Sequence, residues 1–465
     1  MKRLLIILAA MVGCSRAPVV AEEVPVVGEP RVTRKAGDDW PAFLGPTGDS
    51  KSRERGILTQ WPAAGPKILW QRELGTGYAM PTISAGRLFQ FERIGDDATL
   101  TGLESETGRL FWKFTYKSDY ADLYGYDNGP RTSAIVNDGR VYCYGPEGML
   151  HCVSATDGKM IWKVDTKRQF GVIQNFFGVG STPVVEDDLL IVQVGGSPQE
   201  DQKLPPGSLD RVRGNGSGIV AFDKLTGKVR YQITNELASY ASPTLATING
   251  RRWCFMFARG GLVAFDPATG NVDFEFPWRA NMLESVNASN PVVIGDQVFI
   301  SEGYSVGSAL LKVTPGKYEV VWSDADRRRD QAMLLHWNTP IHIDGYLYGS
   351  SGRHEGSAEL RCIEAATGKV MWSEPDLRRS SLLYVDGHFI CLSEDGVLRL
   401  LRVNPEKYEK VAECVLAPAE GLTNRFGLGD NRLLTPQAWA APILSHGLLY
   451  VRGRDRLVCL DLIPE

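Results

Sequence analysis

An eleven-residue frame recurs five times along this chain. In each copy a small residue stands six positions before a Gly, and a large aromatic follows that Gly four positions later. The copies are GLESETGRLFW (102–112), CVSATDGKMIW (152–162), AFDKLTGKVRY (221–231), AFDPATGNVDF (264–274) and CIEAATGKVMW (362–372). Looser copies fill the widest gap, and the spacing is typical of the blades of a β-propeller. One unit is too small to bury a core alone, so neighbouring units must pack together.

A second pattern precedes each frame and predicts a β-hairpin. It consists of a Pro or Ser, a few apolar residues, a turn with Gly and an alternating run, as in SAIVNDGRVYCY (133–144). Asp-Gly, Asn-Gly and His-Gly supply the positive φ values of tight hairpin turns. The frame adds a third strand, a Thr-Gly turn and a fourth strand, and a Pro that cannot donate to a ladder fits the first, innermost strand. The predicted first strands start at Pro81, Ser133, Pro183, Pro243, Pro291, Pro340, Ser381 and Pro442.

Each end of the chain holds an incomplete blade. The last unit starts at Pro442 and ends with its third strand near Leu462, whereas residues 65–74 form a lone fourth strand with its aromatic, Trp70. We therefore predict an all-β fold, an eight-bladed propeller of four-stranded antiparallel blades. The N- and C-terminal strands share one blade and close the ring, which leaves no open sheet edge.

The aromatic that ends each frame has two interpretations. A recurring row of rings is a candidate set for stacking on a ligand, but the same positions can dock each blade onto its neighbour by apolar burial. We favour the docking role, which makes the frame a determinant of the ring and not of activity. The docking residues are Trp70, Trp112, Trp162, Trp322 and Trp372.

The N-terminus predicts export. Residues 1–13 combine a basic start with an apolar run that is too short to span a bilayer. With Cys14 they resemble a bacterial lipoprotein signal peptide, which implies cleavage before Cys14 and lipidation of that residue; a plain secretory signal is the alternative. Ser15, in place of Asp, favours sorting to the outer membrane. We expect residues 1–13 to be the signal peptide, residues 14–39 a flexible tether and residues 40–465 the propeller.

Composition excludes some functions and leaves the state of the cysteines open. The net charge of −4 offers no basic field for nucleic acid, and 43% hydrophobic residues allow a large core. Cys152 and Cys362 fill the small slot of the frame, where Cys acts as a small hydrophobe. A Cys143–Cys152 disulfide is the alternative in an exported protein, but a turn at Pro146-Glu147 pairs Cys143 with Leu150 and leaves Cys152 diagonal.

The residues just before the innermost strands are expected to converge at one mouth of the central channel. They are polar and aromatic, which suits a planar, sugar-like or peptide ligand, although such residues also fill and hydrate a pore. The candidate ligand-binding residues are Tyr78, Asn128, Arg131, Gln174, Asn175, Tyr240, Asn287, His336, Trp337, Asn338, Gln437 and Trp439. A long insertion at 195–216 and the segment 417–439 are further candidates for recognition.

No motif in the sequence indicates catalysis or a metal site. The six histidines lie apart without a cysteine cluster, which disfavours a zinc site. No Gly-x-Ser-x-Gly elbow occurs, and the GNGSG stretch at 214–218 lacks the Lys of a phosphate loop. We therefore predict no catalytic residue and no bound metal.

The frame, with its Thr-Gly-Lys and trailing Trp, resembles the repeat of the pyrroloquinoline-quinone (PQQ) propeller superfamily over residues 39–462. Its members include quinoprotein alcohol dehydrogenases and the non-enzymatic lipoprotein BamB of the outer-membrane assembly machinery. The resemblance implies that a dehydrogenase would hold PQQ beside a disulfide of adjacent cysteines, with Ca²⁺ bound by Glu and Asn and an Asp as base. This chain has no adjacent cysteines and no Cys-x-x-Cys-His haem motif.

The fold alone does not choose among these functions. We expect a monomeric, non-catalytic binding or assembly scaffold, exported and lipid-anchored in the cell envelope, at the outer membrane facing the periplasm. Its partner would be an envelope protein or a small ligand, with no cofactor and no nucleic acid. The alternative is a PQQ-dependent alcohol or sugar dehydrogenase holding PQQ and Ca²⁺, and a third hypothesis is a carbohydrate-binding surface protein.

Overall fold

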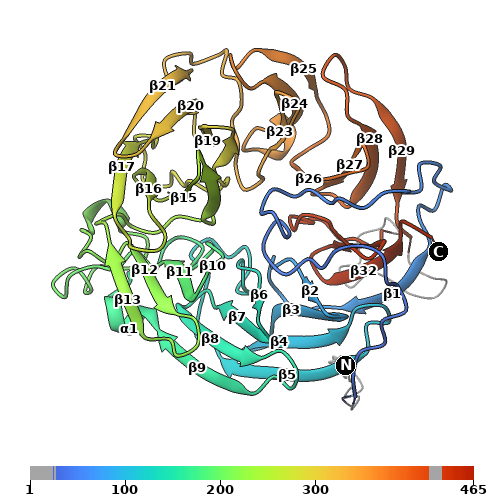
Figure 1. Ribbon diagram of the computed structural model, residues 1–465, viewed down its shortest axis with the longest axis horizontal. Helices are drawn as coiled ribbons and strands as arrows, with labels where there is room; N and C mark the ends of the chain where they lie inside the picture. Colours follow the sequence, from blue (N-terminus) through green and yellow to red (C-terminus); the bar gives the residue numbers. More distant parts are fainter. Residues whose placement is uncertain (1–24, 26–27, 418–431, 465) are drawn as a thin grey trace, which may run out of the picture.

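The computed structural model describes residues 25, 28–417 and 432–464 and forms a ring of eight four-stranded antiparallel sheets. Figure 1 shows the blades following one another around a central axis in the order of the chain. The predicted all-β, eight-bladed propeller is confirmed. The predicted signal peptide and Cys14 lie outside the described residues.

The first four complete blades occupy residues 82–277, and the predicted insertion separates β11 from β12. A short helix, α1 (Thr166–Phe170), follows β9, and a single 3-10 turn, Leu209–Arg211, lies in the insertion. Their strands are β2 (Thr82–Ser84), β3 (Arg87–Ile94), β4 (Asp97–Glu104), β5 (Leu110–Lys117), β6 (Ile135–Asn137), β7 (Arg140–Tyr144), β8 (Met149–Ser154), β9 (Met160–Asp165), β10 (Val184–Glu186), β11 (Leu189–Gln193), β12 (Ile219–Asp223), β13 (Val229–Ile233), β14 (Thr244–Ile248), β15 (Arg251–Phe257), β16 (Gly261–Phe265) and β17 (Val272–Pro277).

The next three blades occupy residues 292–415, with a second 3-10 turn at Glu355–Ser357. Their strands are β18 (Val292–Ile294), β19 (Gln297–Glu302), β20 (Gly307–Thr314), β21 (Lys317–Ser323), β22 (Ile341–Ile343), β23 (Tyr346–Ser351), β24 (Glu359–Glu364), β25 (Val370–Glu374), β26 (Ser380–Val385), β27 (His388–Ser393), β28 (Val397–Arg402) and β29 (Lys410–Val415). Among the described residues, no helix has both the length and the apolar character needed to cross a membrane.

The two ends of the chain share the eighth blade. Its order is β1–β32–β31–β30, with β1 (Ile68–Glu73) outermost, followed by β32 (Arg456–Asp461), β31 (Leu448–Arg452) and β30 (Ile443–Ser445). Trp70 of β1 lies opposite Cys459 of β32. The predicted closure of the ring is therefore confirmed.

The hairpin that opens each blade has the turn that the sequence predicts. In the β6–β7 turn, Asp138 and Gly139 have φ values of 47° and 70°. Two successive residues in the left-handed region match the right-handed twist of the strands they connect. Pro183, Pro243 and Pro291 directly precede their first strands, where the backbone needs no ladder donor.

The aromatic of each frame crosses to the next blade. The Trp112 indole of β5 lies on Gly158, in the turn between β8 and β9, and its Nε1–H donates to the Ala155 carbonyl oxygen at 3.0 Å. Four other indoles donate in the same way at 2.9 to 3.1 Å, namely Trp70 to Ser105, Trp162 to Lys224, Trp322 to Ala365 and Trp372 to Asn404. The frame therefore joins each of these blades to the next through a ring and a hydrogen bond.

A belt of hydrogen bonds joins the blades around the channel, just before the first strands. In each step a backbone N–H donates to the side chain of the equivalent residue in the next blade, at 2.8 to 3.1 Å. The steps run from Met80 to Ser133, Thr182, Ser242, Asn290 and Thr339 in turn. A buried N–H without a partner is costly, so this belt helps to fix the blades against one another.

The N-terminal segment 40–52, here called the strap, crosses the ring at the far ends of the first strands. Trp40 exchanges two backbone hydrogen bonds with Ile83 of β2, at 2.8 and 3.0 Å. At its other end the backbones of Ser50 and Ser52 bond to Tyr384 of β26, at 2.9 and 2.8 Å. Figure 1 shows this segment, in blue, passing through the middle of the ring. The strap therefore obstructs one end of the channel.

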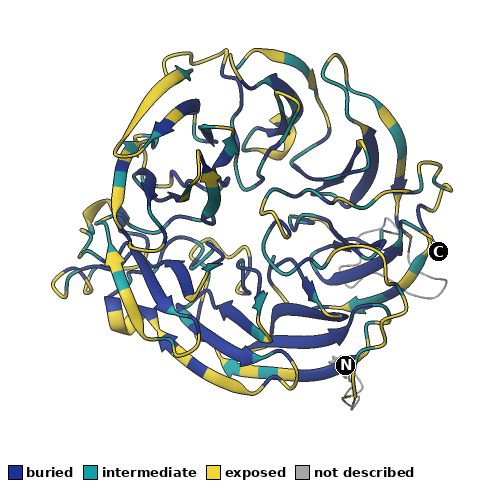
Figure 2. Ribbon diagram, viewed as in Figure 1, coloured by how far each residue is buried: buried dark blue, intermediate teal, exposed yellow. Residues whose placement is uncertain are grey.

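Burial decreases from the centre of the ring outward. Figure 2 shows buried residues along the second and third strands and exposed residues along the outermost strands. The seven cysteines that the structure describes are buried and unpaired. Cys143 lies opposite His151 and not opposite Leu150, because the turn is centred on Glu147, one register step beyond the predicted centre. Cys152 then faces the opposite side of the sheet from Cys143.

The part of the predicted tether at residues 28–39 lies against the ring. The backbone N–H groups of Arg31 and Thr33 donate to the carboxylates of Glu104 and Glu106 at 2.8 and 2.7 Å. The Arg34 guanidinium bonds to the last strand, β32, through a carboxylate at 2.7 Å. The division of the chain at residues 14 and 39 stays a prediction.

Candidate functional site

The centre of the ring holds a cavity of about 330 Å³. Every first strand starts at one face of the ring and the second strand returns to it, so two sets of loops surround the mouth on that face. Phe43, Leu44 and Ser50 of the strap line the other end of the cavity. The propeller therefore carries a central pocket of the size of a small-molecule site, with the strap as its floor.

Seven of the predicted mouth residues line this cavity. They are Tyr78, Arg131, Tyr240, His336, Trp337, Asn338 and Trp439. Because they come from different blades, the ring brings together residues that lie hundreds of positions apart in sequence. The structure thus gathers the aromatic and cationic members of the predicted set in one place.

Apart from Asn338, the amide side chains of the predicted set do not line this cavity. Asn175 and Asn287 donate to backbone carbonyls of neighbouring loops at 2.8 to 3.0 Å. Asn128 accepts a backbone N–H, and Gln437 accepts the hydroxyl of Tyr78, each at 2.9 Å. These four amides form hydrogen bonds with groups of the surrounding loops and do not line the cavity. Gln174 and Asn175 line a second cavity instead.

Arg131 sits between two aromatic faces on one side of the mouth. Its guanidinium carbon lies 5.6 Å from the Tyr78 ring centre and 5.5 Å from that of Phe177. The same guanidinium forms an ion pair with Asp122, whose side chain is buried and outside the cavity lining. Cation–π contacts and this pair hold Arg131 in place.

Arg379 occupies an equivalent position on the opposite side of the mouth. Its guanidinium lies 4.5 Å from the Trp337 ring centre and 5.3 Å from that of Trp439. Glu394, behind it, accepts both from Arg379 Nε, at 2.9 and 3.0 Å, and from Trp439 Nε1, at 3.0 Å. One buried carboxylate therefore orients a cation and an indole that both face the cavity.

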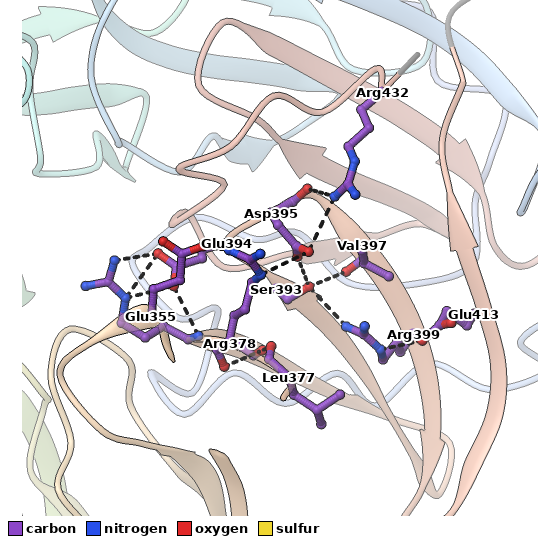
Figure 3. Close-up of polar contacts among 12 residues, drawn as sticks. Glu355, Leu377, Arg378, Ser393, Glu394, Asp395, Val397, Arg399, Glu413 and Arg432 are labelled. Atoms are coloured by element: carbon purple, nitrogen blue, oxygen red, sulfur yellow. Dashed lines mark hydrogen bonds and ion pairs between the residues drawn. The ribbon is translucent and has the colours of Figure 1, made fainter. Parts of the chain in front are cut away.

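Glu394 belongs to a polar network in the β27–β28 loop, which Figure 3 shows. Asp395 accepts from the Ser393 hydroxyl at 2.6 Å, and Arg432 lies at Asp395 with a contact of 3.4 Å. Arg399 bridges Ser393 and Glu413 with hydrogen bonds of 3.0 and 2.6 Å. The carboxylates behind this side of the mouth are thus engaged by arginines.

Arg353 is the third guanidinium at the cavity. It lies 4.4 Å from the ring centre of Tyr304 and 3.1 Å from Nε2 of His354. The neighbouring His336 packs on Tyr304 at 5.8 Å between ring centres. Burial, and the positive charges of Arg379 and Arg353, lower the pKa of His336 to about 3, so this imidazole is neutral at pH 7.

The described cavity lining contains no carboxylate. A Ca²⁺-bound quinone requires oxygen ligands such as Glu and Asn, and its oxidation chemistry requires a base. Asp122 and Glu394 lie behind the lining and are paired with arginines, and the described residues hold no cluster of three or more potential metal ligands. The donor set at this mouth does not fit a PQQ–Ca²⁺ centre.

Several residues that line the cavity are not among the predicted mouth residues. Tyr304 and Arg353 come from loops between second and third strands, which reach the same face as the predicted loops. That topology follows from the blade pattern and is the signal that finds them. Phe177 and Arg379 also line the cavity and lie in the loops that precede the first strands β10 and β26, so the same blade pattern locates them.

The insertion between β11 and β12 borders a second cavity of about 220 Å³. Leu209 and Val212 of the insertion line it together with Glu147 and Lys167 from the preceding blade. The predicted recognition loop therefore borders a cavity of its own, beside the central one.

The ring, its docking indoles and its central pocket define a PQQ-type β-propeller. The sequence model of the family described as "outer membrane protein assembly factor BamB" matches residues 96–374, more than half of the chain. The protein belongs to this family. No curated protein matches the sequence.

Solved structures share the architecture at low sequence identity. BamB from Moraxella catarrhalis aligns with a TM-score of 0.55 and 14% identity, over 86% of this chain and 98% of that chain. Quinohemoprotein alcohol dehydrogenase from Comamonas testosteroni aligns with a TM-score of 0.60 and 12% identity, over 92% of this chain and 81% of that chain. A europium-containing methanol dehydrogenase aligns with a TM-score of 0.51 and 13% identity, over 91% of each chain. At these identities the likeness establishes the fold alone.

Proposed function

We propose that this protein is an exported, non-catalytic binding propeller that serves as an assembly or binding scaffold at the cell envelope. The observation that carries the proposal is the chemistry of the mouth, where aromatic faces and guanidinium groups surround a cavity whose described lining has no carboxylate. Such a surface can hold a ligand or a protruding segment of a partner, but its described lining offers no carboxylate to act as a base or to bind Ca²⁺. The description of the family as an outer membrane protein assembly factor supports a role in the envelope.

The competing function is a PQQ-dependent dehydrogenase, because solved dehydrogenases share this fold. Purified protein is mixed with PQQ and Ca²⁺, and the absorbance spectrum and dye-linked oxidation of alcohols and sugars are measured. We expect no stoichiometric quinone and no turnover. A tightly bound quinone together with turnover would overturn the scaffold proposal.

Partner capture tests the mouth as the binding surface. The tagged full-length protein is cross-linked in intact cells, and Trp337→Ala is compared with Tyr318→Ala, which removes a half-exposed ring from the outermost strand β21. We expect the mouth variant to lose envelope partners and the outer-strand variant to keep them. The reverse pattern would move the binding surface to the outer edge of the ring.

The lipid anchor belongs to the same proposal and has its own test. If Cys14 is lipidated, Cys14→Ala abolishes labelling by a radiolabelled fatty acid and releases the protein from the membrane fraction. Unchanged labelling and fractionation would refute an anchor at this residue and leave a plain secretory signal.

A further inference from the structure

We propose that the mouth cavity binds a planar organic monoanion, with its carboxylate at Arg353 and its ring among the aromatic side chains. The proposal rests on the proposed binding function and deepens it by naming the class of ligand. It follows from three properties of the cavity: the kind of surface that lines it, the balance of charge around it and its closed floor.

The lining offers flat apolar faces at short range. Tyr78 and Trp439 have their ring centres 4.6 Å apart, and Trp337 and Trp439 have theirs 5.0 Å apart. Further rings face the same cavity, namely Tyr126, Phe177, Tyr240 and Tyr304. Aromatic faces at this density favour a planar ring over a branched aliphatic or a flexible chain.

The cavity lining carries three guanidinium groups, and only two of them are paired with a carboxylate. Arg131 and Arg379 are neutralised by Asp122 and Glu394 respectively. Among the described residues, no carboxylate forms an ion pair with Arg353. The site therefore has one cation for which a ligand can supply the counter-charge, which favours a monoanion over a neutral or polyanionic molecule.

Glu302, on which the positive charge of Arg353 acts, is already engaged by other donors. Glu302 is buried and accepts from the Ser285 hydroxyl at 2.6 Å and from the Tyr304 backbone N–H at 2.7 Å. It therefore fixes the loop that carries Tyr304, on which the Arg353 guanidinium rests. A guanidinium held against a ring face presents its N–H edge for a bidentate carboxylate.

The strap gives the cavity a floor. Phe43 and Leu44 close the end opposite the mouth, so a ligand that enters with its apolar ring first buries that ring. Arg353 is only partly buried and lies in the β23–β24 loop, at the mouth face. The amphiphilic shape of an aromatic carboxylate matches this gradient from an apolar floor to a cationic rim.

Calorimetric titration of the purified full-length protein tests the proposal with 2-naphthoate as the probe. We expect binding of one molecule per chain, at least tenfold weaker binding of neutral 2-naphthamide, and no gain for the dianion 2,6-naphthalenedicarboxylate. Arg353→Gln is expected to weaken 2-naphthoate at least tenfold. The matched control is Arg230→Gln, at an exposed arginine on the outermost strand β13, which is expected to leave the affinity unchanged.

Several outcomes overturn the proposal. No heat of binding at millimolar 2-naphthoate, equal affinity for the amide, or an unaffected Arg353→Gln variant with native circular dichroism each refutes it. If 2-naphthoate fails to bind while Trp337→Ala still loses envelope partners, only the ligand class is wrong. If Trp337→Ala leaves capture intact while 2-naphthoate binds, the scaffold function at the mouth is wrong and the ligand site stands.

Discussion

The indole of Trp112 lies so close to Gly158 of the next blade that a Cβ placed on Gly158 would stand 2.5 Å from the ring. Gly158 also has φ of 69°. The Gly of the frame therefore serves two purposes, since it makes the turn and leaves space for a ring from another blade.

Gly158→Ala is predicted to destabilise the protein more than Gly139→Ala. Both glycines have φ near 70°, so both variants carry the strain of a left-handed alanine, roughly 1–2 kcal/mol. Only Gly158 has a ring in contact, whereas nothing lies within 4 Å of a Cβ at Gly139. Overpacking against Trp112 adds about 1–3 kcal/mol. The two urea-unfolding free energies measure the difference, and equal losses would show that the ring moves aside without cost.

The hydrogen-bond belt around the channel gives a second stability prediction. Thr182→Val removes the acceptor of the buried Ser133 N–H, at 3.0 Å, and is expected to cost about 1–3 kcal/mol. Thr247→Val, at an exposed position on β14, is the control and is expected to change stability by less than about 0.5 kcal/mol. Unfolding in urea measures both. A loss at Thr182 no larger than that of the control would mean that the belt contributes nothing to stability.

The sequence determines much of the ring because each blade carries its own local signals. The Thr-Gly turn, the hairpin tip such as Asp138-Gly139 and the aromatic at the fourth strand are all short-range features. Closure also follows, because a fourth strand at Trp70 without predecessors and a final unit without a fourth strand complete each other. The hydrogen bonds of the belt, such as the one between Ser133 and Thr182, could not be predicted, because Ser and Thr are also common in ordinary turns that precede a strand.

The functional face is less predictable, and the reasons are physical. Its position follows from where the first strands begin, which correctly brings Tyr78, Arg131 and Trp439 together. The ion pairs that neutralise Arg131 and leave Arg353 without a carboxylate depend on loop conformations that no repeat specifies. The strap has no periodic signal either, since residues 40–52 contact β2 and β26 through backbone groups that any side chain could provide.

Release of the strap is a third prediction. Trp40 is 1% exposed, and Trp40→Ala is expected to cost about 3–5 kcal/mol because the cavity left behind cannot collapse fully. Loss of the Trp40 anchor also exposes the backbone around Lys51, so brief trypsin digestion, followed by mass spectrometry, is expected to show faster cleavage there. Met160→Ala, at a half-exposed side chain on β9, is the control and keeps the wild-type cleavage pattern. Unchanged cleavage at Lys51 in Trp40→Ala would show that the strap is held by its backbone bonds alone.

A histidine at a hairpin tip gives a pH-dependent prediction. Both ring nitrogens of His446 face acceptors, Nδ1 the Ala36 carbonyl at 3.0 Å and Nε2 the Asp39 carboxylate at 3.1 Å. The hydrogen bond to Asp39 raises the pKa of His446 above its ordinary value, although burial opposes it. Burial alone would raise the pKa of Asp39, but the bonds from His446, Ala85 and Ser84 outweigh it and lower that pKa.

The two shifts fix the sign of the effect. A histidine with a raised pKa stabilises the fold below its unfolded pKa of about 6.5, and the stabilisation is lost as the pH rises through the folded pKa. The lowered pKa of Asp39 acts at the other end, since its contribution is lost only as the pH falls below about 3.9. As the pH rises from 6 to 8.5, we therefore expect the thermal midpoint of the wild type to decline more than that of His446→Gln. Thr247→Val, at an exposed and non-titrating position on β14, is the control and keeps the wild-type profile. If His446→Gln shows the same decline as the wild type, the imidazole is not held as a cation between Ala36 and Asp39.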